Sequence, residues 1–170
     1  PTNLVRLVEE SIEAVQPLAA KKGSDIRLVA PGGYFEADLD QRRIRRILQN
    51  LLGNAIDHGE AQPIVVYVDS NEEAVAFAVR DYGVGMSAVD VERVFDRFWR
   101  ADPSRQRTTG GTGLGLAISL EDAAIHGGTL DVWSEAGGGT CFRVTLPRRR
   151  GTTIDGDSPL ALPPDTEVPA

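Results

Sequence analysis

Asn50-Leu51-Leu52-Gly53-Asn54-Ala55 lies in the most regular helical pattern of this chain and is the first of four motifs that decide its fold. The other three follow in order: Asp81-Tyr82-Gly83-Val84-Gly85, Phe95-Asp96-Arg97-Phe98 and Gly111-Thr112-Gly113-Leu114-Gly115-Leu116. They supply an amide-bearing helix, an acidic glycine turn, an aromatic pair and a glycine-rich loop. Each motif is weak evidence alone, but all four in this order predict a nucleotide-binding site.

The first motif sits on a predicted helix that begins near Asp40, a good N-cap residue, and stops at His58-Gly59. Its apolar residues recur at helical spacing: Ile44, Ile47, Leu48, Leu51, Leu52, Ala55 and Ile56. Asn54 falls at the edge of this apolar arc, and Asn50 lies one turn earlier on the same side. Amide oxygens suit Mg²⁺, whereas the alternative is that one asparagine caps a neighbouring loop.

The second motif follows a predicted strand over Val75 to Arg80. A carboxylate at the strand end, Asp81, can accept a hydrogen bond from an exocyclic amine such as that of adenine. Gly83 and Gly85 permit positive φ and let the backbone approach a ligand closely. The alternative is an ordinary turn, because Asp and Gly favour turns.

The glycine-rich stretch Gly111 to Leu116 leads into a helix predicted over Leu114 to Ile125. Free N–H groups at a helix start, together with the helix dipole, form a phosphate site. The pattern is not a P-loop, because it lacks Gly-x-x-x-x-Gly-Lys-Ser/Thr. It does not have the Rossmann spacing either, and the chain has no His-Arg-Asp of the usual protein kinases.

Between these motifs lie Phe95, Phe98 and Trp99, whose spacing usually indicates core residues and can alternatively belong to a mobile lid. Arginines accompany them, and we expect phosphate contacts from Arg97 and Arg105. A plain solvated loop is the alternative for each arginine, and residues 101–111 are predicted to be a mobile loop. His58 could reach a phosphate, whereas His126 ends a helix, where a cationic group suits the dipole.

The remaining pattern predicts an α/β layer fold. Further elements are expected at 4–21 (helix), 26–30 and 34–37 (short strands around Pro31-Gly32-Gly33), 64–68 (strand), 89–98 (short helix), and 130–133 with 141–146 (hairpin). After Pro147 the sequence becomes acidic and proline-rich, so residues 148–170 are predicted to be a disordered tail beyond a domain at 1–147.

The composition excludes several classes. A net charge of −7 argues against nucleic-acid binding, and one cysteine with two histidines excludes an internal disulfide and a zinc cluster. Cys141 alternates with apolar residues and is predicted to be a strand residue rather than a nucleophile. No apolar run is long enough for a membrane helix. A start at Pro1 suggests a piece of a longer protein.

Taken together, the four motifs resemble the N, G1, F and G2 boxes of the catalytic and ATP-binding domain of sensor histidine kinases. Asp96 to Asp102 and Ile56 to Glu60 look especially like the MtrB type of actinobacteria. The resemblance implies a Bergerat-type fold, a two-layer sandwich of a mixed β-sheet and about three α-helices. It also implies that Asn54, with Asn50 nearby, holds Mg²⁺, that Asp81 reads adenine, and that Gly111 to Leu116 wraps the phosphates of ATP.

The same resemblance indicates what this chain lacks. Related ATPases such as gyrase place a general-base glutamate where this chain has Asn50, and an amide cannot take a proton from water. We therefore expect phosphoryl transfer rather than efficient hydrolysis. Neither His58-Gly59 nor His126-Gly127 resembles the phosphoacceptor, so no residue is identified as catalytic with certainty. Asp57 stands where many members have a basic residue, and we expect it to face away.

The partners implied are a histidine-bearing dimerisation domain of the same parent protein and a response regulator, in the MtrB type an MtrA-like one. The resemblance places this domain on the cytoplasmic side of a membrane-anchored parent, and we expect the fragment itself to be monomeric. The alternatives are an ATPase of the gyrase group, a serine kinase of the anti-sigma type, and a degenerate domain that only binds nucleotide.

Overall fold

The computed structural model describes residues 1–96 and 115–166. Its main sheet has the strand order β2-β4-β5-β7-β6, from strands Ile26–Val29, Ile64–Ser70, Ala74–Asp81, Gly139–Pro147 and Thr129–Glu135. Only β2 and β4 run parallel, so the sheet is mixed. Two residues at each of β1 (Thr2–Asn3) and β3 (Glu36–Ala37) form a separate small ladder.

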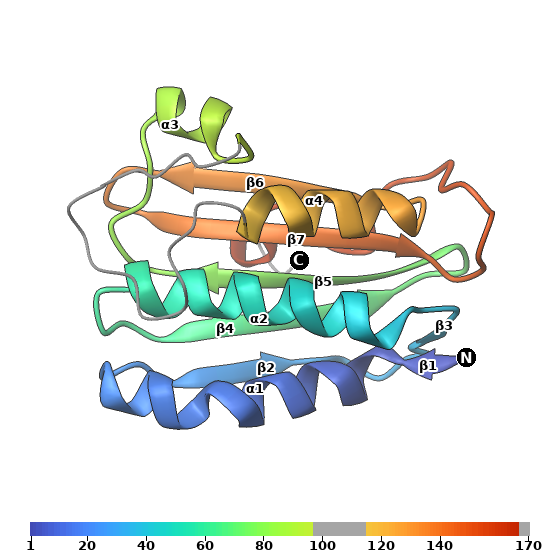
Figure 1. Cartoon of the computed structure of the whole chain (residues 1–170), viewed down its shortest axis with the longest axis horizontal. Helices are drawn as coiled ribbons and strands as arrows, with labels where there is room; N and C mark the ends of the chain where they lie inside the picture. The colour runs from blue at the N-terminus through green and yellow to red at the C-terminus, as the bar shows by residue number, and fades with distance from the viewer. Residues whose placement is uncertain (97–114, 167–170) are drawn as a thin grey trace.

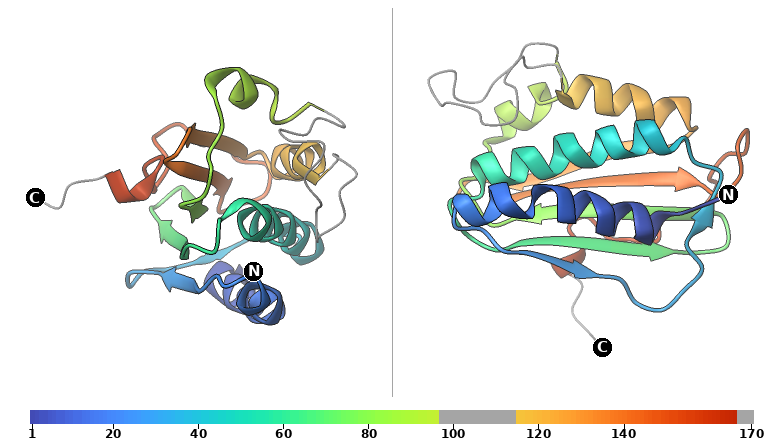
Figure 2. Two further views of the ribbon diagram at one scale, coloured as in Figure 1. Left: turned by 90° about the vertical axis from the view of Figure 1, so that its left-hand side faces the viewer. Right: turned by 60° about the horizontal axis from the view of Figure 1, so that its bottom comes forward.

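Three long helices lie side by side on one face of this sheet (Figure 1). They are α1 (Leu4–Lys21), α2 (Gln41–His58) and α4 (Gly115–Ile125), and a short α3 (Ala88–Arg93) stands at one end. The edge-on view in Figure 2 shows the helices and the sheet as two layers. The predicted two-layer sandwich with a mixed sheet is therefore confirmed.

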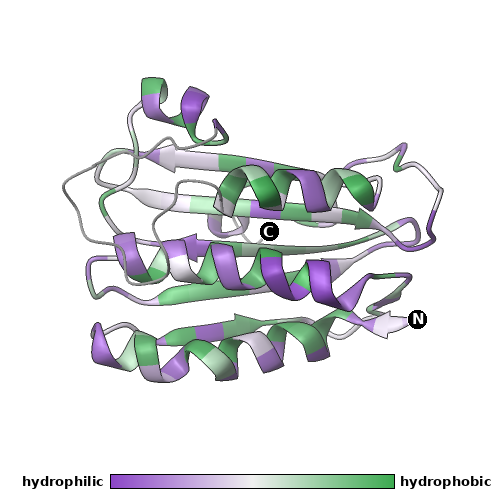
Figure 3. Cartoon of the chain, viewed as in Figure 1, coloured by the Kyte–Doolittle hydropathy of each residue, from purple (hydrophilic) through white to green (hydrophobic). Residues whose placement is uncertain are grey.

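The core lies between these layers because each element presents one apolar face to it. The inward residues of β5 are Val75, Phe77 and Val79, and the helix α2 buries its predicted apolar stripe against them. In Figure 3, α2 carries hydrophilic residues on the surface turned to the viewer, and the strands behind it are largely hydrophobic. Asp40 caps α2 as predicted, accepting a hydrogen bond from the Arg43 amide at 3.4 Å.

The two short strands beside Pro31-Gly32-Gly33 lie in different sheets, because β2 joins the main sheet and β3 pairs with β1. One local prediction differs from the structure. The helical segment expected from Val89 ends early, at Arg93, and gives way to a turn at Val94 and Phe95.

The segment after Pro147 also differs from the expected disorder. The structure places its described part against the sheet face opposite the helices, with Leu160 only 8% exposed among Ala76, Ala78 and Cys141. Figure 2 shows this segment on the far side of the sheet from the helices. Small alanines at the outward positions of β5 leave room for an apolar side chain, and two tail leucines fill it. An average over the segment's composition misses those two residues.

Candidate nucleotide-binding site

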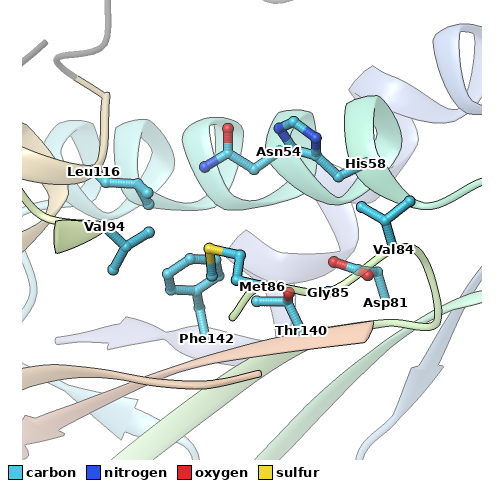
Figure 4. Close-up of a pocket in the computed structure, with 10 residues that line it drawn as sticks. All are labelled: Asn54, His58, Asp81, Val84, Gly85, Met86, Val94, Leu116, Thr140 and Phe142. Carbon is cyan, nitrogen blue, oxygen red and sulfur yellow. The ribbon is translucent and has the colours of Figure 1, made fainter. Parts of the chain in front are cut away.

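Three of the four motifs contribute side chains or backbone to one pocket where α2 ends above the end of β5 (Figure 4): Asn54, Asp81 with Val84 and Gly85, and Leu116. Side chains from α2, the β5–α3 loop, the start of α4 and the strand β7 surround it. Its lining residues are Asn54, His58, Asp81, Val84, Gly85, Met86, Val94, Leu116, Thr140 and Phe142. Polar groups therefore occupy a few defined positions in an otherwise apolar wall, which is the usual character of a small-molecule site.

Asp81 is the buried charge of this pocket, with 5% of its surface exposed. Its carboxylate accepts a hydrogen bond from the Gly83 amide at 3.0 Å. Burial raises the pKa of Asp81 to about 6, although hydrogen bonds from the Gly83 and Thr140 backbone and the charge of Arg80 oppose this. A buried carboxylate with spare acceptor capacity gains from a ligand that donates N–H groups, as an aminopurine does.

Gly83 and Gly85 are needed because other parts of the backbone pass close to them, whereas the sequence suggested that a ligand would do so. A Cβ on Gly83 would lie 1.8 Å from the carbonyl oxygen of His58, and one on Gly85 would lie 1.9 Å from that of Glu135. Gly85 also has φ of +68°, which favours glycine. The two glycines let the loop pass between the end of α2 and the β6–β7 hairpin, so that Asp81 faces the pocket. Gly85 lines the pocket as well.

Asn54 and His58 lie one turn apart on α2 and face Asp81 across the pocket (Figure 4). Asn50, one further turn back, is not among the lining residues. Its amide nitrogen donates to the Gly115 carbonyl and to the Ser119 hydroxyl, both at 3.1 Å. Asn50 thus ties α2 to the first turn of α4, and its side-chain oxygen is the atom that remains for a cation.

The side chains of this site that could bind Mg²⁺ are the amide oxygens of two asparagines. Within residues 1–96 and 115–166 no group of three His, Cys, Asp or Glu side chains could hold a metal ion. The oxygens of Asn54 and Asn50 could supply one or two ligands, with the balance from water and ligand phosphates, as Mg²⁺ commonly accepts. The Asn50 nitrogen bonds two residues of helix α4 rather than a neighbouring loop.

Five lining residues were not predicted from the sequence: Val84, Met86, Val94, Thr140 and Phe142. Thr140 and Phe142 share the inward face of β7, so the period-two alternation of that strand could have indicated them. Phe95 packs edge-on against Phe142, with ring centroids 6.2 Å apart. Phe95 is half-buried and packs against the core, which agrees for this residue with the core interpretation of the aromatic motif.

Some predicted site residues lie outside the described part of the chain. These are Arg97, Arg105, Gly111, Thr112, Gly113 and Leu114, with Phe98 and Trp99 of the aromatic motif. The described end of the glycine-rich stretch fits the prediction, because α4 begins at Gly115 and Leu116 lines the pocket.

Cys141 and His126 both lie outside the pocket lining. Cys141 is buried, and burial raises the pKa of its thiol to about 12, which suits a strand residue and not a nucleophile. His126 accepts a hydrogen bond from the Asp40 amide through Nε2 at 3.0 Å, so its hydrogen is on Nδ1, which lies 2.8 Å from the Asp122 carbonyl. The ring is structural, as predicted, because it links the start of α2 to the end of α4.

The sheet is mixed and has three helices on one face, and the pocket lies between α2, which carries Asn54, and the end of β5, which carries Asp81. This arrangement defines an ATPase-type nucleotide-binding domain. The chain belongs to the family of histidine kinase-, DNA gyrase B- and HSP90-like ATPases, whose model matches residues 39–150.

The individual similarities point to sensor kinases within that family. The chain is 48% identical over 157 residues to the sensor histidine kinase MtrB of Mycobacterium tuberculosis, covering 92% of this chain and 28% of that protein. It is 41% identical over 132 residues to the sensor histidine kinase WalK of Bacillus subtilis, covering 75% of this chain and 21% of WalK. The chain therefore spans less than a third of these relatives.

Solved structures of histidine kinases are also similar to this chain. Full-length ShkA in complex with AMPPNP has a TM-score of 0.75 at 31% identity, covering 86% of this chain and 30% of ShkA. The catalytic domain of the histidine kinase ThkA has a TM-score of 0.77 at 24% identity, covering 88% of this chain and 95% of that domain, which shows the shared fold. The family prediction made from the four motifs is confirmed.

Proposed function

We propose that this domain binds Mg-ATP and presents the γ-phosphate to a histidine on a separate dimerisation domain of a two-component sensor kinase. The observation that carries the proposal is the buried Asp81 carboxylate at the bottom of a pocket whose opposite wall holds Asn54 and His58. Family membership and the AMPPNP complex of ShkA support ATP as the ligand.

In this proposal the chain's own groups bind and orient the nucleotide. The Asp81 carboxylate accepts a hydrogen bond from the adenine amine, and the apolar wall of Met86, Val94 and Phe142 holds the ring. The oxygens of Asn54 and Asn50 would hold the magnesium ion, which would neutralise phosphate charge when bound. The start of α4 and His58 would contact the phosphates, and Arg97 and Arg105 stay predicted phosphate contacts from the sequence.

The reaction proposed is a direct phosphoryl transfer. A neutral imidazole nitrogen of the partner attacks the γ-phosphorus, the bond to the β–γ bridging oxygen breaks, ADP leaves, and the imidazole loses its proton to solvent. Imidazole is itself a good nucleophile, so no base in this chain is needed. At the position of the gyrase-type base this chain has Asn50, whose amide nitrogen bonds the α4 start.

The partners follow from the same proposal. The phosphoacceptor domain belongs to the parent protein, which is anchored in a membrane with this domain on the cytoplasmic side, and a response regulator, MtrA-like by kinship with MtrB, receives the phosphate. No helix among the described residues is long and apolar enough to cross a bilayer.

The test is phosphorylation in trans. The domain, [γ-³²P]ATP and Mg²⁺ are mixed with the histidine-bearing dimerisation domain of an MtrB-type kinase. We expect an acid-labile, base-stable phosphate on the acceptor, absent when its histidine is replaced by glutamine. Release of free phosphate without acceptor labelling would favour the gyrase-type ATPase instead, and neither product would favour a degenerate binding module.

A further inference from the structure

The C-terminal segment 156–165 crosses the sheet face opposite the helices and reaches the strand end that carries Asp81. Near its start, the Gly156 amide donates to Glu73 at 3.2 Å. Further along, the Ser158 hydroxyl lies 2.8 Å from that of Thr145. Leu160 then buries its side chain, and its carbonyl accepts a hydrogen bond from Arg143 at 2.9 Å. These contacts position Asp165 next to the end of β5 that carries Asp81.

Asp165 contacts a buried cation at that end. The Arg80 guanidinium lies between the rings of Tyr82 and Trp133, at 4.2 and 4.7 Å from their centroids, and its side chain is 7% exposed. The carboxylate of Asp165 pairs with Arg80 Nε at 3.1 Å and accepts a hydrogen bond from the Tyr82 hydroxyl at 2.7 Å. A cation this deeply buried needs a paired anion, which the tail supplies.

Arg80 also links the end of β5 to the β6–β7 hairpin, which forms part of the pocket wall. Its Nη1 donates to the carbonyl of Asp81 and to that of Gly138, the latter at 2.9 Å. The β6–β7 hairpin is thereby fixed against the end of β5, and Thr140, two residues beyond Gly138, lines the pocket. A Cβ on Gly139 would lie 2.1 Å from the Asp81 carbonyl, which shows how closely the two strands meet there.

Because side chains alternate between the two faces at the end of β5, the contacts of Asp165 fall on the two neighbours of Asp81. Successive side chains of a strand point to opposite faces, so Arg80 and Tyr82 meet the tail while Asp81 between them faces the pocket. Asp165 therefore holds both neighbours of the residue expected to read adenine. We propose that the segment 156–165 is an internal brace of the nucleotide site and that Asp165 is a positioning residue for Asp81. This inference rests on the proposed function.

The experiment compares ATP with inosine triphosphate, which lacks the exocyclic amine. Calorimetric dissociation constants for both nucleotides with Mg²⁺ are measured for the full chain and for Asp165→Asn and Tyr82→Phe. We expect each substitution to weaken ATP binding by roughly three- to tenfold and to leave the weaker inosine triphosphate binding nearly unchanged. Tyr82→Phe removes a single hydroxyl, so it provides a test if Asp165→Asn fails to fold.

Asp157→Asn is the matched control, because the contact recorded for Asp157 is through its carbonyl, to Asn71 at 3.3 Å. It should bind both nucleotides as the unchanged chain does. A wild type that binds neither nucleotide would overturn the proposed function. A wild type that prefers ATP, with the same ratio of ATP to inosine triphosphate affinity in folded Asp165→Asn and Tyr82→Phe, would overturn the brace alone. A parallel loss for both nucleotides would also overturn it, because that indicates general loosening.

Discussion

Asp81 combines a binding role with a cost to folding. Its folded pKa, about 6, lies above the ordinary value of 3.8 because burial disfavours the charged form. Folding therefore binds a proton between these two pH values, and the ionised side chain destabilises the nucleotide-free protein above pH 6. At pH values below 3.8 both states are protonated, so this cost is absent there.

We predict that Asp81→Asn abolishes ATP binding and yet stabilises the nucleotide-free domain above pH 6. The shift of the pKa corresponds to a gain of at most about 3 kcal/mol in the free energy of unfolding. The gain should shrink as the pH falls from 6 towards 4. Urea unfolding of both proteins at several pH values measures it, and a pH-independent difference would contradict the assignment.

Asn50 should matter for the attachment of α4 as well as for any cation. We predict that Asn50→Asp lowers the free energy of unfolding by about 1–3 kcal/mol, because a carboxylate cannot donate to the Gly115 carbonyl or to Ser119, which is fully buried. Hydrogen exchange should quicken first at the start of α4. Gln49→Glu, on the exposed side of α2, is the control, and equal stability of the two variants would refute the tie.

At the scale of elements, α4 is attached to α2 by a buried carboxylate. Asp122 is 1% exposed and bonds Arg43 Nη1 at 2.8 Å and Arg46 Nη2 at 2.7 Å. Burial alone would raise the pKa of Asp122, but the hydrogen bonds from Arg46 and Arg43 outweigh it and hold the pKa below its ordinary value. Because α4 also carries Leu116 into the pocket, this attachment supports the site.

We predict that Asp122→Asn lowers the free energy of unfolding by about 2 kcal/mol at pH 7, since both arginines are partly exposed and can regain water. The lowered pKa means that this contribution is complete above about pH 4 and is lost as the pH falls through the folded value. Unfolding curves at pH 7 and pH 3 test both parts. A loss that persists undiminished at pH 3 would contradict the ion-pair explanation.

Element prediction succeeded where periodicity was strong and failed where pairing was non-local. The apolar stripe of α2 and its Asp40 cap were visible in sequence because they depend on residues within a few turns. The partner of β2 is β4, which follows a whole helix later in the chain, so the turn at Pro31-Gly32-Gly33 beside β2 could not indicate that pairing. The roles of Gly83 and Gly85 likewise depended on neighbours, His58 and Glu135, that only the fold brings close.

At the scale of the whole molecule, the middle of the sheet is covered on both faces, and every residue of β5 is buried. The sequence predicted the family, the layers and the acidic end of the pocket because these follow from local motifs. It did not predict the outer cover, because the tail's polar composition concealed Leu160 and Asp165, whose partners on β5 lie about 80 residues away in sequence. Averages over composition cannot detect contacts of that kind.

We predict that Leu160→Ala lowers the free energy of unfolding by about 2 kcal/mol through the cavity it leaves over Ala76, Ala78 and Cys141. Asp155→Ala, at an exposed position in the same segment, should change it by less than about 0.5 kcal/mol. Chemical denaturation of both variants measures the difference. Equal stability of the two would mean that the tail does not cover the sheet in solution.

The most direct test of the central claim, an adenine-reading nucleotide site at the end of β5, is a calorimetric titration of Mg-ATP into the domain and into Asp81→Asn. We predict micromolar binding for the unchanged chain, about −8 kcal/mol at a dissociation constant of 1 µM, and its near loss in the variant. Binding that survives Asp81→Asn would contradict the site described here, and no binding by the folded wild type would contradict the proposed function itself.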